Sequence, residues 1–256
     1  MSELFSVAGK VALVTGGSRG IGQMIARALV AGGARVYVSS RKAAVCDQAA
    51  AELSALGECH SLPADLSKMS EVERLAATLG EREQALHILV NNAGATWGAS
   101  IEAFPEQGWD KVMDLNVKSV FFLTQKLLPL LEQAASPADP ARVINIGSVD
   151  GLHMPAFENF SYAPSKAALH HLTRMLATTL APRAITVNAI APGPFATDMM
   201  APMVATMGEK IVGAVPLGRM GEGDDIGGVA VFLSSRAGAY ITGAVLPVDG
   251  GLLGAS

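Results

Sequence analysis

The sequence predicts a single doubly wound α/β domain. Short runs rich in Val, Ile and Leu alternate with longer Ala/Leu-rich stretches along the chain, which is the pattern of repeated strand–helix–strand units. Right-handed crossovers between such strands give a parallel sheet with helices on both faces. No charge run or Ser/Pro-rich linker divides the 256 residues. We therefore expect residues 1–256 to form one domain.

Seven short segments are expected to be the parallel strands. Each is largely apolar or β-branched, as buried strands are, and they lie at 11–15, 35–39, 59–62, 87–91, 142–146, 185–190 and 244–248. Helical patterns fall between them, at 20–32, 42–56, 68–84, 106–132, 161–181 and 224–234. The last helix starts with Asp224 and Asp225 ahead of an apolar run, which indicates helix capping. The Pro-rich stretch at 136–140 is expected to be a surface loop.

The composition argues against several kinds of protein. The net charge of −4 does not suit a broad nucleic-acid-binding surface. Charged residues, Gly or Pro interrupt every apolar stretch well before the ~18 residues that indicate a membrane span, and the N-terminal segment lacks the basic start of a signal peptide. Cys46 and Cys59 have no CxxC spacing. We expect neither a disulfide nor a metal site, and a cytoplasmic location.

A glycine-rich turn, TGGSRGIG, follows the first predicted strand at 15–22. Glycines in such a place allow a tight turn and close approach of the backbone to a pyrophosphate, and the next helix offers free N–H groups and a positive dipole. The spacing is GxxxGxG rather than GxGxxG, so the position between strand and helix carries the interpretation. We expect a Rossmann-type nucleotide site whose turn residues are Gly16, Ser18, Arg19, Gly20, Ile21 and Gly22.

The end of the second predicted strand indicates which nucleotide binds. A site for NAD usually places an acidic residue there for the ribose 2′-hydroxyl, whereas this chain has Ser40 and then Arg41. With Arg19 in the phosphate turn, two guanidinium groups are available to pair with a 2′-phosphate. The alternative is that both arginines are ordinary solvated surface residues. The sequence favours NADP(H).

Tyr162 and Lys166 lie four residues apart, and Ser148 lies fourteen residues before the tyrosine. Residues at i and i+4 project from one face of a helix. A free phenol has a pKa of about 10, which a neighbouring ammonium and the positive charge of oxidised nicotinamide would lower. In isolation such a Tyr/Lys pair is usually surface decoration, and a lone serine after a strand is usually a turn residue. Together with the nucleotide turn they predict hydride transfer between a nicotinamide and a carbonyl or alcohol.

The order of these motifs resembles the short-chain dehydrogenase/reductase family. Along the chain stand TGGSRGIG (15–22), Asp65, NNAG (91–94), Asn116 in DLNVKS, Ser148, Tyr162 with Lys166, the Pro192–Gly193 pair, and Thr197. They span most of the chain, and their shared order is more specific than any single motif. The resemblance implies that Tyr162 donates a proton, Ser148 binds the substrate oxygen, Lys166 holds the ribose hydroxyls, and Asn116 anchors a water that relays protons from Lys166.

The resemblance also implies roles for residues along the nucleotide. Asp65 and Leu66 would flank the adenine, while the segment Asn92, Ala93 and Gly94 would line the cofactor cleft. The nicotinamide end would be held by Pro192, Gly193, Phe195 and Thr197. Taken singly, Asp65 also suits a helix cap, NNAG a turn, and Pro192–Gly193 a loop break.

Pro164, between Tyr162 and Lys166, departs from simple helical expectation. Proline is accommodated in the first turn of a helix, but further along it kinks the helix. The sequence leaves both geometries open.

The substrate pocket is expected around Trp97, residues 150–157 and a lid near 194–220. His153 lies in this region, either as a pocket residue or as a plain loop histidine. The lid contains Met199, Met200, Met203 and Met207, and methionines suit adaptable apolar surfaces, although such a stripe is more often a core face. We expect a bulky apolar substrate.

Within the family, the chain is most similar to NADPH-dependent 3-oxoacyl thioester reductases, including the bacterial type linked to rhamnolipid synthesis. This implies a ketone substrate carried on acyl carrier protein or on coenzyme A. Arg174 and Arg183 match basic positions for carrier docking, whereas Asp139 stands where a basic residue is often found, which argues against docking. The alternative is a general carbonyl reductase or secondary alcohol dehydrogenase acting on a sugar, a steroid or a cyclic ketone.

Two further hypotheses concern the whole molecule. The fold would also serve a non-catalytic NADP-binding regulator, since fold does not fix function, but such proteins typically lose the tyrosine or the lysine. The long helical stretches 106–132 and 161–181 are rich in apolar residues. They pack on the sheet or, as the family resemblance implies, form a subunit interface, so we expect a homo-oligomer, either a dimer or a tetramer.

Overall fold

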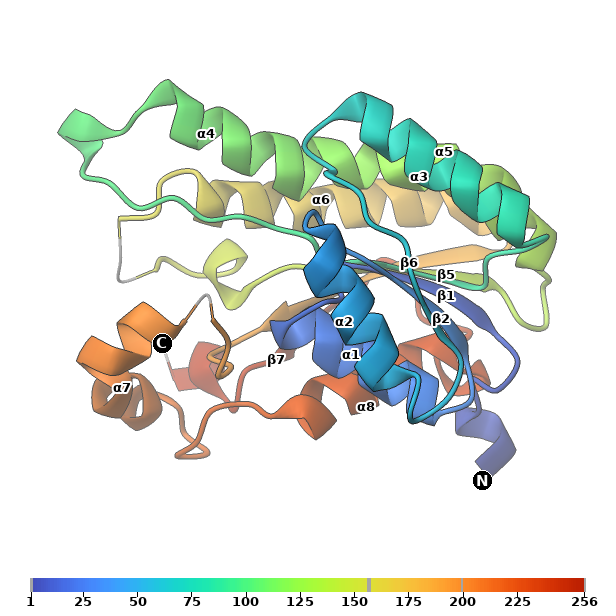
Figure 1. Cartoon of the computed structure of the whole chain (residues 1–256). Helices are drawn as coiled ribbons and strands as arrows, with labels where there is room; N and C mark the ends of the chain where they lie inside the picture. The colour runs from blue at the N-terminus through green and yellow to red at the C-terminus, as the bar shows by residue number, and fades with distance from the viewer. Residues whose placement is uncertain (1, 156–157, 199, 256) are drawn as a thin grey trace.

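A seven-stranded parallel sheet forms the centre of the molecule. The computed structural model describes residues 2–155, 158–198 and 200–255 (Figure 1). The strands are β1 Val11–Thr15, β2 Arg35–Ser39, β3 Cys59–Ser61, β4 Ile88–Asn91, β5 Ala141–Ile146, β6 Ile185–Pro192 and β7 Val245–Val248. They are ordered β3-β2-β1-β4-β5-β6-β7 and every pairing is parallel. The doubly wound fold with seven parallel strands, predicted from the alternation of segments, is confirmed.

Helices cover both faces of this sheet (Figure 1). Their bounds are α1 Gly20–Ala31, α2 Ala43–Leu53, α3 Met69–Arg82, α4 Glu106–Met113, α5 Ser119–Ala134, α6 Tyr162–Leu180, α7 Ala201–Ala214 and α8 Gly223–Ser234. Buried side chains of α1, α2 and α8 form a core on one face. Those of α3, α5 and α6 form a second core on the other.

Strand β1 shows how the sequence builds both cores. Side chains alternate between the faces of a strand, so Ala12 and Val14 pack under α1 and α8 while Leu13 packs under α3 and α5. All three are fully buried. Burying one such leucine stabilises the fold by about 1.5–3 kcal/mol. A nearly continuous apolar run is therefore what a strand covered on both sides requires.

The strand order places a crevice at the carboxyl ends of β1 and β4. The chain runs outward from β1 through β2 and β3, then returns to β4 on the other side of β1. Ligands of open α/β sheets bind at such a switch point, beyond the carboxyl ends of the strands. The turns that follow β1, β4, β5 and β6 all lie at this edge.

The sequence predicts a single helical stretch at 106–132, whereas the structure interrupts the α-helix there with a π-helical turn. The helix α4 ends at Met113, a π-helical turn covers Asp114–Lys118, and α5 follows from Ser119. Such turns widen a helix by one residue and are frequent at functional sites. Apolar periodicity could not reveal this turn because the pattern on either side of it is helical.

Helix α7 lies in the segment expected to be a lid and was not predicted as a helix. It has a kink at Met207, whose φ is −136°. Gly208 and Gly213 weaken its helical signal.

Within the part of the chain that the structure describes, no helix is both long and apolar enough to cross a membrane. Cys46 and Cys59 are both buried and unoxidised.

Candidate active site

The four residues predicted to be catalytic come from three elements at the carboxyl edge of the sheet. Ser148 follows β5, Tyr162 and Lys166 begin α6, and Asn116 lies in the π-helical turn. Ser148, Lys166 and Asn116 are buried, while Tyr162 keeps part of its surface exposed. The nitrogen Nζ of Lys166 lies 5.5 Å from the centroid of the Tyr162 ring. The structure therefore brings both side chains to the same side of α6.

Pro164 occupies the first turn of α6, which settles the geometry that the sequence left open. The helix begins at Tyr162, and Ser165 already donates its N–H to the carbonyl of Ser161 at 3.1 Å. The first N–H groups of a helix have no partner within the helix, so a proline there sacrifices none. The four-residue spacing from Tyr162 to Lys166 thus survives without a kink.

Burial dominates the protonation of the Tyr/Lys pair. It raises the pKa of Tyr162 to about 12, an effect that the hydrogen bond with Ser148 opposes and the carboxylate of Asp150 reinforces. Burial also lowers the pKa of Lys166 to about 8. Its ammonium donates to the carbonyl of Ile146 at 2.8 Å. This direction is opposite to the lowering that we expected from Lys166 and oxidised nicotinamide, and it keeps Tyr162 a neutral phenol at pH 7.

Asn116 ties the loop after β4 to α6. Its Oδ1 accepts the N–H of Ala95 at 2.8 Å, and its Nδ2 donates to the carbonyl of Ala95 at 3.0 Å and to Ser165 Oγ at 2.9 Å. Ser165 in turn donates to the carbonyl of Tyr162 at 2.6 Å. Both amide donors of Asn116 are therefore in use within the protein. Its expected role in holding a water remains a prediction.

The glycine-rich turn has the geometry of a phosphate cradle. Gly16 and Gly20 have positive φ, at 63° and 54°, where side chains are strained. A Cβ on Gly16 would lie 2.7 Å from Asn92 Nδ2. That amide holds the turn by donating to the carbonyls of Thr15 and Gly16 at 2.9 and 3.2 Å. Asn92, expected to line the cofactor cleft, therefore supports the glycine-rich turn through its side chain.

The end of β2 fits a nucleotide that carries a 2′-phosphate. The hydroxyl of Ser40 is buried and has no hydrogen-bond partner among the described residues, and the exposed Arg41 follows it. An unpaired buried hydroxyl costs free energy unless a ligand satisfies it. In the glycine-rich turn, Arg19 forms an exposed ion pair with Asp198 at 3.2 Å. A hydroxyl donor and two guanidinium groups are what a phosphate ester needs.

Several other predicted nucleotide contacts have side chains directed elsewhere. Asp65 accepts the hydroxyl of Ser67 at 2.8 Å, closing a local turn, and Leu66 and Phe195 are buried in the two cores. These two residues can offer only backbone groups to a nucleotide. Near the phosphate turn, Thr197 lies against Gly20, and Gly94 lies close to Asn116 and Lys166. The remaining predicted contacts occupy the same edge of the sheet: Ser18, Ile21, Gly22, Ala93, Pro192 and Gly193.

The predicted substrate side is apolar and exposed. Leu152, Met154 and Phe160 are 40%, 89% and 37% exposed in the segment after Ser148. Trp97 is less available than expected because its ring packs on Gly108 and lies 5.0 Å from Lys111 Nζ. His153 lies beside Asp150, with Nε2 3.7 Å from Oδ1. Residues 156–157 and Met199 lie outside the described residues.

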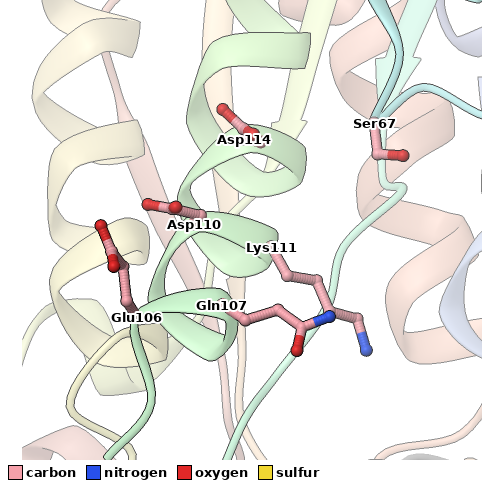
Figure 2. A pocket seen from close by; sticks show the side chains of 6 residues that line it. All are labelled: Ser67, Glu106, Gln107, Asp110, Lys111 and Asp114. Carbon is pink, nitrogen blue, oxygen red and sulfur yellow. The ribbon is translucent and has the colours of Figure 1, made fainter.

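A separate open pocket of about 470 Å³ lies against α4. Figure 2 shows Gln107 and Lys111 extending toward the side of Ser67, while Glu106 and Asp110 point away from it. None of the predicted catalytic residues lines this pocket. It is a surface hollow beside the site.

Three residues near the site were given no individual role by the sequence, although Asp150 falls within the predicted pocket segment 150–157. Asp150 donates its N–H to Ser148 Oγ at 3.1 Å, Ser165 links Asn116 to Tyr162, and His170 is buried against Gly147 and Gly151. Ser165 and His170 lie three and eight residues after Tyr162 on the predicted helix, so helical spacing offered a signal for both. The sequence did not show that the Asp150 side chain would be three-quarters enclosed.

Similar proteins of known sequence and structure identify the family. The family model described as enoyl-(acyl carrier protein) reductase matches residues 16–253. The chain is 51% identical over 253 residues to the rhamnolipids biosynthesis 3-oxoacyl-[acyl-carrier-protein] reductase of Pseudomonas aeruginosa, covering 98% of this chain and 99% of that one. The chain belongs to the short-chain dehydrogenase/reductase family. It is also 41% identical over 251 residues to the P. aeruginosa 3-oxoacyl-[acyl-carrier-protein] reductase FabG, covering 96% and 98% of the two chains.

Solved structures of this family superpose on the whole chain. The NADP active-site complex of P. aeruginosa RhlG has a TM-score of 0.95 at 51% identity, covering 98% of this chain and 99% of that one. A short-chain type dehydrogenase/reductase from Mycobacterium marinum has a TM-score of 0.91 at 30% identity, covering 98% of both chains. Members of the family are nicotinamide-dependent oxidoreductases, and the arrangement of Ser148, Tyr162 and Lys166 matches that chemistry.

Proposed function

We propose that the protein is an NADPH-dependent reductase that converts a 3-oxoacyl thioester into the 3-hydroxyacyl thioester. The observation that carries this proposal is the hydroxyl pair of Ser148 and Tyr162 beside Lys166, at the edge where the phosphate cradle and Ser40 would hold NADPH. When bound, NADPH supplies the hydride that adds to the carbonyl carbon. The relatives named as 3-oxoacyl reductases support the substrate class.

The chain's own residues supply the proton and the orientation. Tyr162 gives its phenolic proton to the carbonyl oxygen as negative charge develops there, a step worth roughly 10²–10⁴ in rate. The hydroxyl of Ser148 donates to the same oxygen and stabilises that charge. Lys166 has its ammonium 2.8 Å from the carbonyl of Ile146, which positions it for the ribose hydroxyls and for the return of a proton to Tyr162.

The apolar loop after Ser148 supports a bulky substrate. Exposed apolar side chains such as Met154 and Leu152 are unfavourable in water, and an acyl chain would cover them. The segment 194–220, which contains α7, would act as the lid over this chain. Among the described side chains of α7 none is buried, so this segment has little packing to hold it in one position.

The charges on the surface bear on the carrier of the acyl group. Asp139, which argued against a carrier protein, is paired with Lys10 at 2.8 Å and with Arg142 at 3.0 Å, so its charge is neutralised. Arg183 is paired with Glu132 at 3.0 Å, which leaves Arg174 exposed on α6 as the cation for an acidic carrier. We propose that both acyl carrier protein and coenzyme A thioesters are accepted.

Steady-state rates with a panel of substrates test the proposal. NADPH oxidation is expected with 3-oxoacyl thioesters at kcat/KM values well above those for simple ketones, sugars and trans-2-enoyl thioesters. Tyr162→Phe should lose at least about 100-fold in kcat. The variant should still bind NADPH, which a fluorescence titration with NADPH would show. Turnover only with sugars or simple ketones would show that the proposed substrate class is wrong. A Tyr162→Phe variant with full activity would refute the mechanism.

The location and the assembly are part of the same proposal. Two buried free thiols suit a reducing cytoplasm. Met175 on α6 is 59% exposed, and helices α5 and α6 would meet their copies in a homo-oligomer. Sedimentation velocity of the purified protein tests this, since a monomer at micromolar concentration would refute it.

A further inference from the structure

The ion pair between Arg19 and Asp198 joins the phosphate turn to the start of the lid segment 194–220. Arg19 Nη1 lies 3.2 Å from Asp198 Oδ2, and both side chains are 71% exposed. Beside this pair, Thr197 packs on the backbone of Gly20, since a Cβ on Gly20 would lie 3.3 Å from Thr197 Cγ2. Two neighbouring contacts therefore attach residues 197–198 to the phosphate turn.

The chain on the two sides of Asp198 is held very differently. Before it, Phe195 is 2% exposed, its ring packs on Gly221, and the two residues form a β-bridge. After it, the helix α7 has no buried side chain among those described. The fixed segment at Phe195 therefore keeps the carboxylate of Asp198 within reach of Arg19, whatever the position of α7.

Arg19 has two competing uses. It is one of the two guanidinium groups that fit a 2′-phosphate, and of these two only Arg19 has a carboxylate partner among the described residues. A guanidinium binds a phosphate best through two parallel N–H groups, and a phosphate monoester carries about −1.5 to −2 charges at pH 7. The carboxylate of Asp198 occupies one of those N–H groups. It also repels a phosphate that approaches the same guanidinium.

We propose that Asp198 is a specificity-determining residue that competes with the 2′-phosphate of the nucleotide for Arg19. It thereby lowers the affinity for NADPH and leaves the affinity for NADH unchanged, because NADH has only a hydroxyl at that position. The inference rests on the proposed function for the cofactor alone and requires no thioester turnover. The preference for NADPH that Ser40, Arg19 and Arg41 create is thus limited by a residue of the lid segment.

Fluorescence titrations with NADPH and with NADH test this in matched variants. Asp198→Asn keeps the shape of the side chain and removes its charge. Glu209→Gln removes the same charge from an exposed site on α7 that forms no ion pair with a described residue. Exposed ion pairs are weak, so the Kd of Asp198→Asn for NADPH should fall by about two- to fivefold. Its Kd for NADH should stay the same, and Glu209→Gln should match the unmodified protein with both nucleotides.

Two results would overturn the inference. One is an unchanged Kd for NADPH in folded Asp198→Asn, or in Asp198→Ala should the asparagine variant not fold. The other is an equal fall for NADPH and NADH, which would mean that Asp198 acts on the lid and not through the 2′-phosphate. Thermal unfolding of each variant confirms that it is folded.

A double-mutant cycle shows whether the effect passes through Arg19. Arg19→Ala should raise the Kd for NADPH, and adding Asp198→Asn to it should then give little further change. A full gain in the Arg19→Ala background would mean that Asp198 repels the phosphate directly, and it would overturn the competition for Arg19. These titrations contain no substrate. A protein that reduces no thioester would therefore defeat the proposed substrate while leaving the role of Asp198 to be read from the two nucleotides.

Discussion

The imidazole of His170 occupies the space beside Gly147 that any side chain there would need. His170 is 2% exposed and lies one turn after Lys166 on α6. Gly147 and Gly151, which both contact it, flank Ser148 in sequence. The loop that carries Ser148 therefore packs against a neutral buried ring.

Gly147→Ala should damage both stability and turnover. The new methyl group would collide with the ring of His170, and overpacking of this kind costs about 1–3 kcal/mol. Thermal unfolding should show the loss, and kcat should fall because Ser148 is displaced. His170→Ala made in the same chain should restore part of the stability, since it vacates the space. If Gly147→Ala and the double variant lost the same amount of stability, the contact between residue 147 and His170 would be contradicted.

Stability should fall in weakly acidic solution because of His170. Burial, aided by Lys166, lowers the pKa of this imidazole to about 4 from 6.5. Between pH 6.5 and 4 the unfolded chain binds a proton at His170 that the folded chain does not bind. The contribution of His170 to the free energy of unfolding is therefore complete above pH 6.5 and is lost as the pH falls from 6.5 through 4. The change is roughly 3 kcal/mol for a shift of this size. Urea unfolding of the protein and of His170→Gln across this range measures it, and parallel curves would contradict the assignment.

Arg41→Ala should change the choice of nucleotide. Losing a charge-assisted contact to a 2′-phosphate costs about 1.5–3 kcal/mol, which predicts a fall of roughly 10- to 150-fold in kcat/KM for NADPH. The value for NADH should hold steady. Arg27→Ala, which removes an equally exposed arginine from α1, is the control. A variant that loses both nucleotides alike would show that Arg41 supports the fold rather than the phosphate.

Ser165→Ala should act through Tyr162. The hydroxyl accepts from Asn116 at 2.9 Å and donates to the Tyr162 carbonyl at 2.6 Å, and leaving a buried donor unpaired costs about 1–3 kcal/mol. We expect a lower melting temperature and a lower kcat with little change in the KM for NADPH. Asn116→Ala should show the same pattern, and the double variant should lose less than the sum. Additive losses would indicate two independent sites.

The fold could be read from the sequence because each strand is a short apolar run separated by helical stretches. The core alternation in β1 follows from that pattern alone. Pro164 could not be placed from the sequence. Only the observed start of α6 shows that it falls in the first turn, where N–H groups have no partner within the helix. The burial of Asp150 and His170 could not be predicted because it depends on how the turn Val149–Gly151 packs against α6, which local sequence patterns do not show. The inward direction of Leu66 and Phe195 was hidden for the same reason.

The π-helical turn at Asp114–Lys118 makes α4 and α5 differ by one residue from a continuous helix. Each residue turns a helix by about 100°, so removing one here would swing α4 around its axis or drive Asn116 away from Ala95 and Ser165. A regular α-helix at Asp114–Lys118 would be more stable than the π-helical turn. The molecule keeps the wider turn, and converting it into regular α-helix to stabilise the protein would break the hydrogen bonds by which Asn116 joins the loop after β4 to α6.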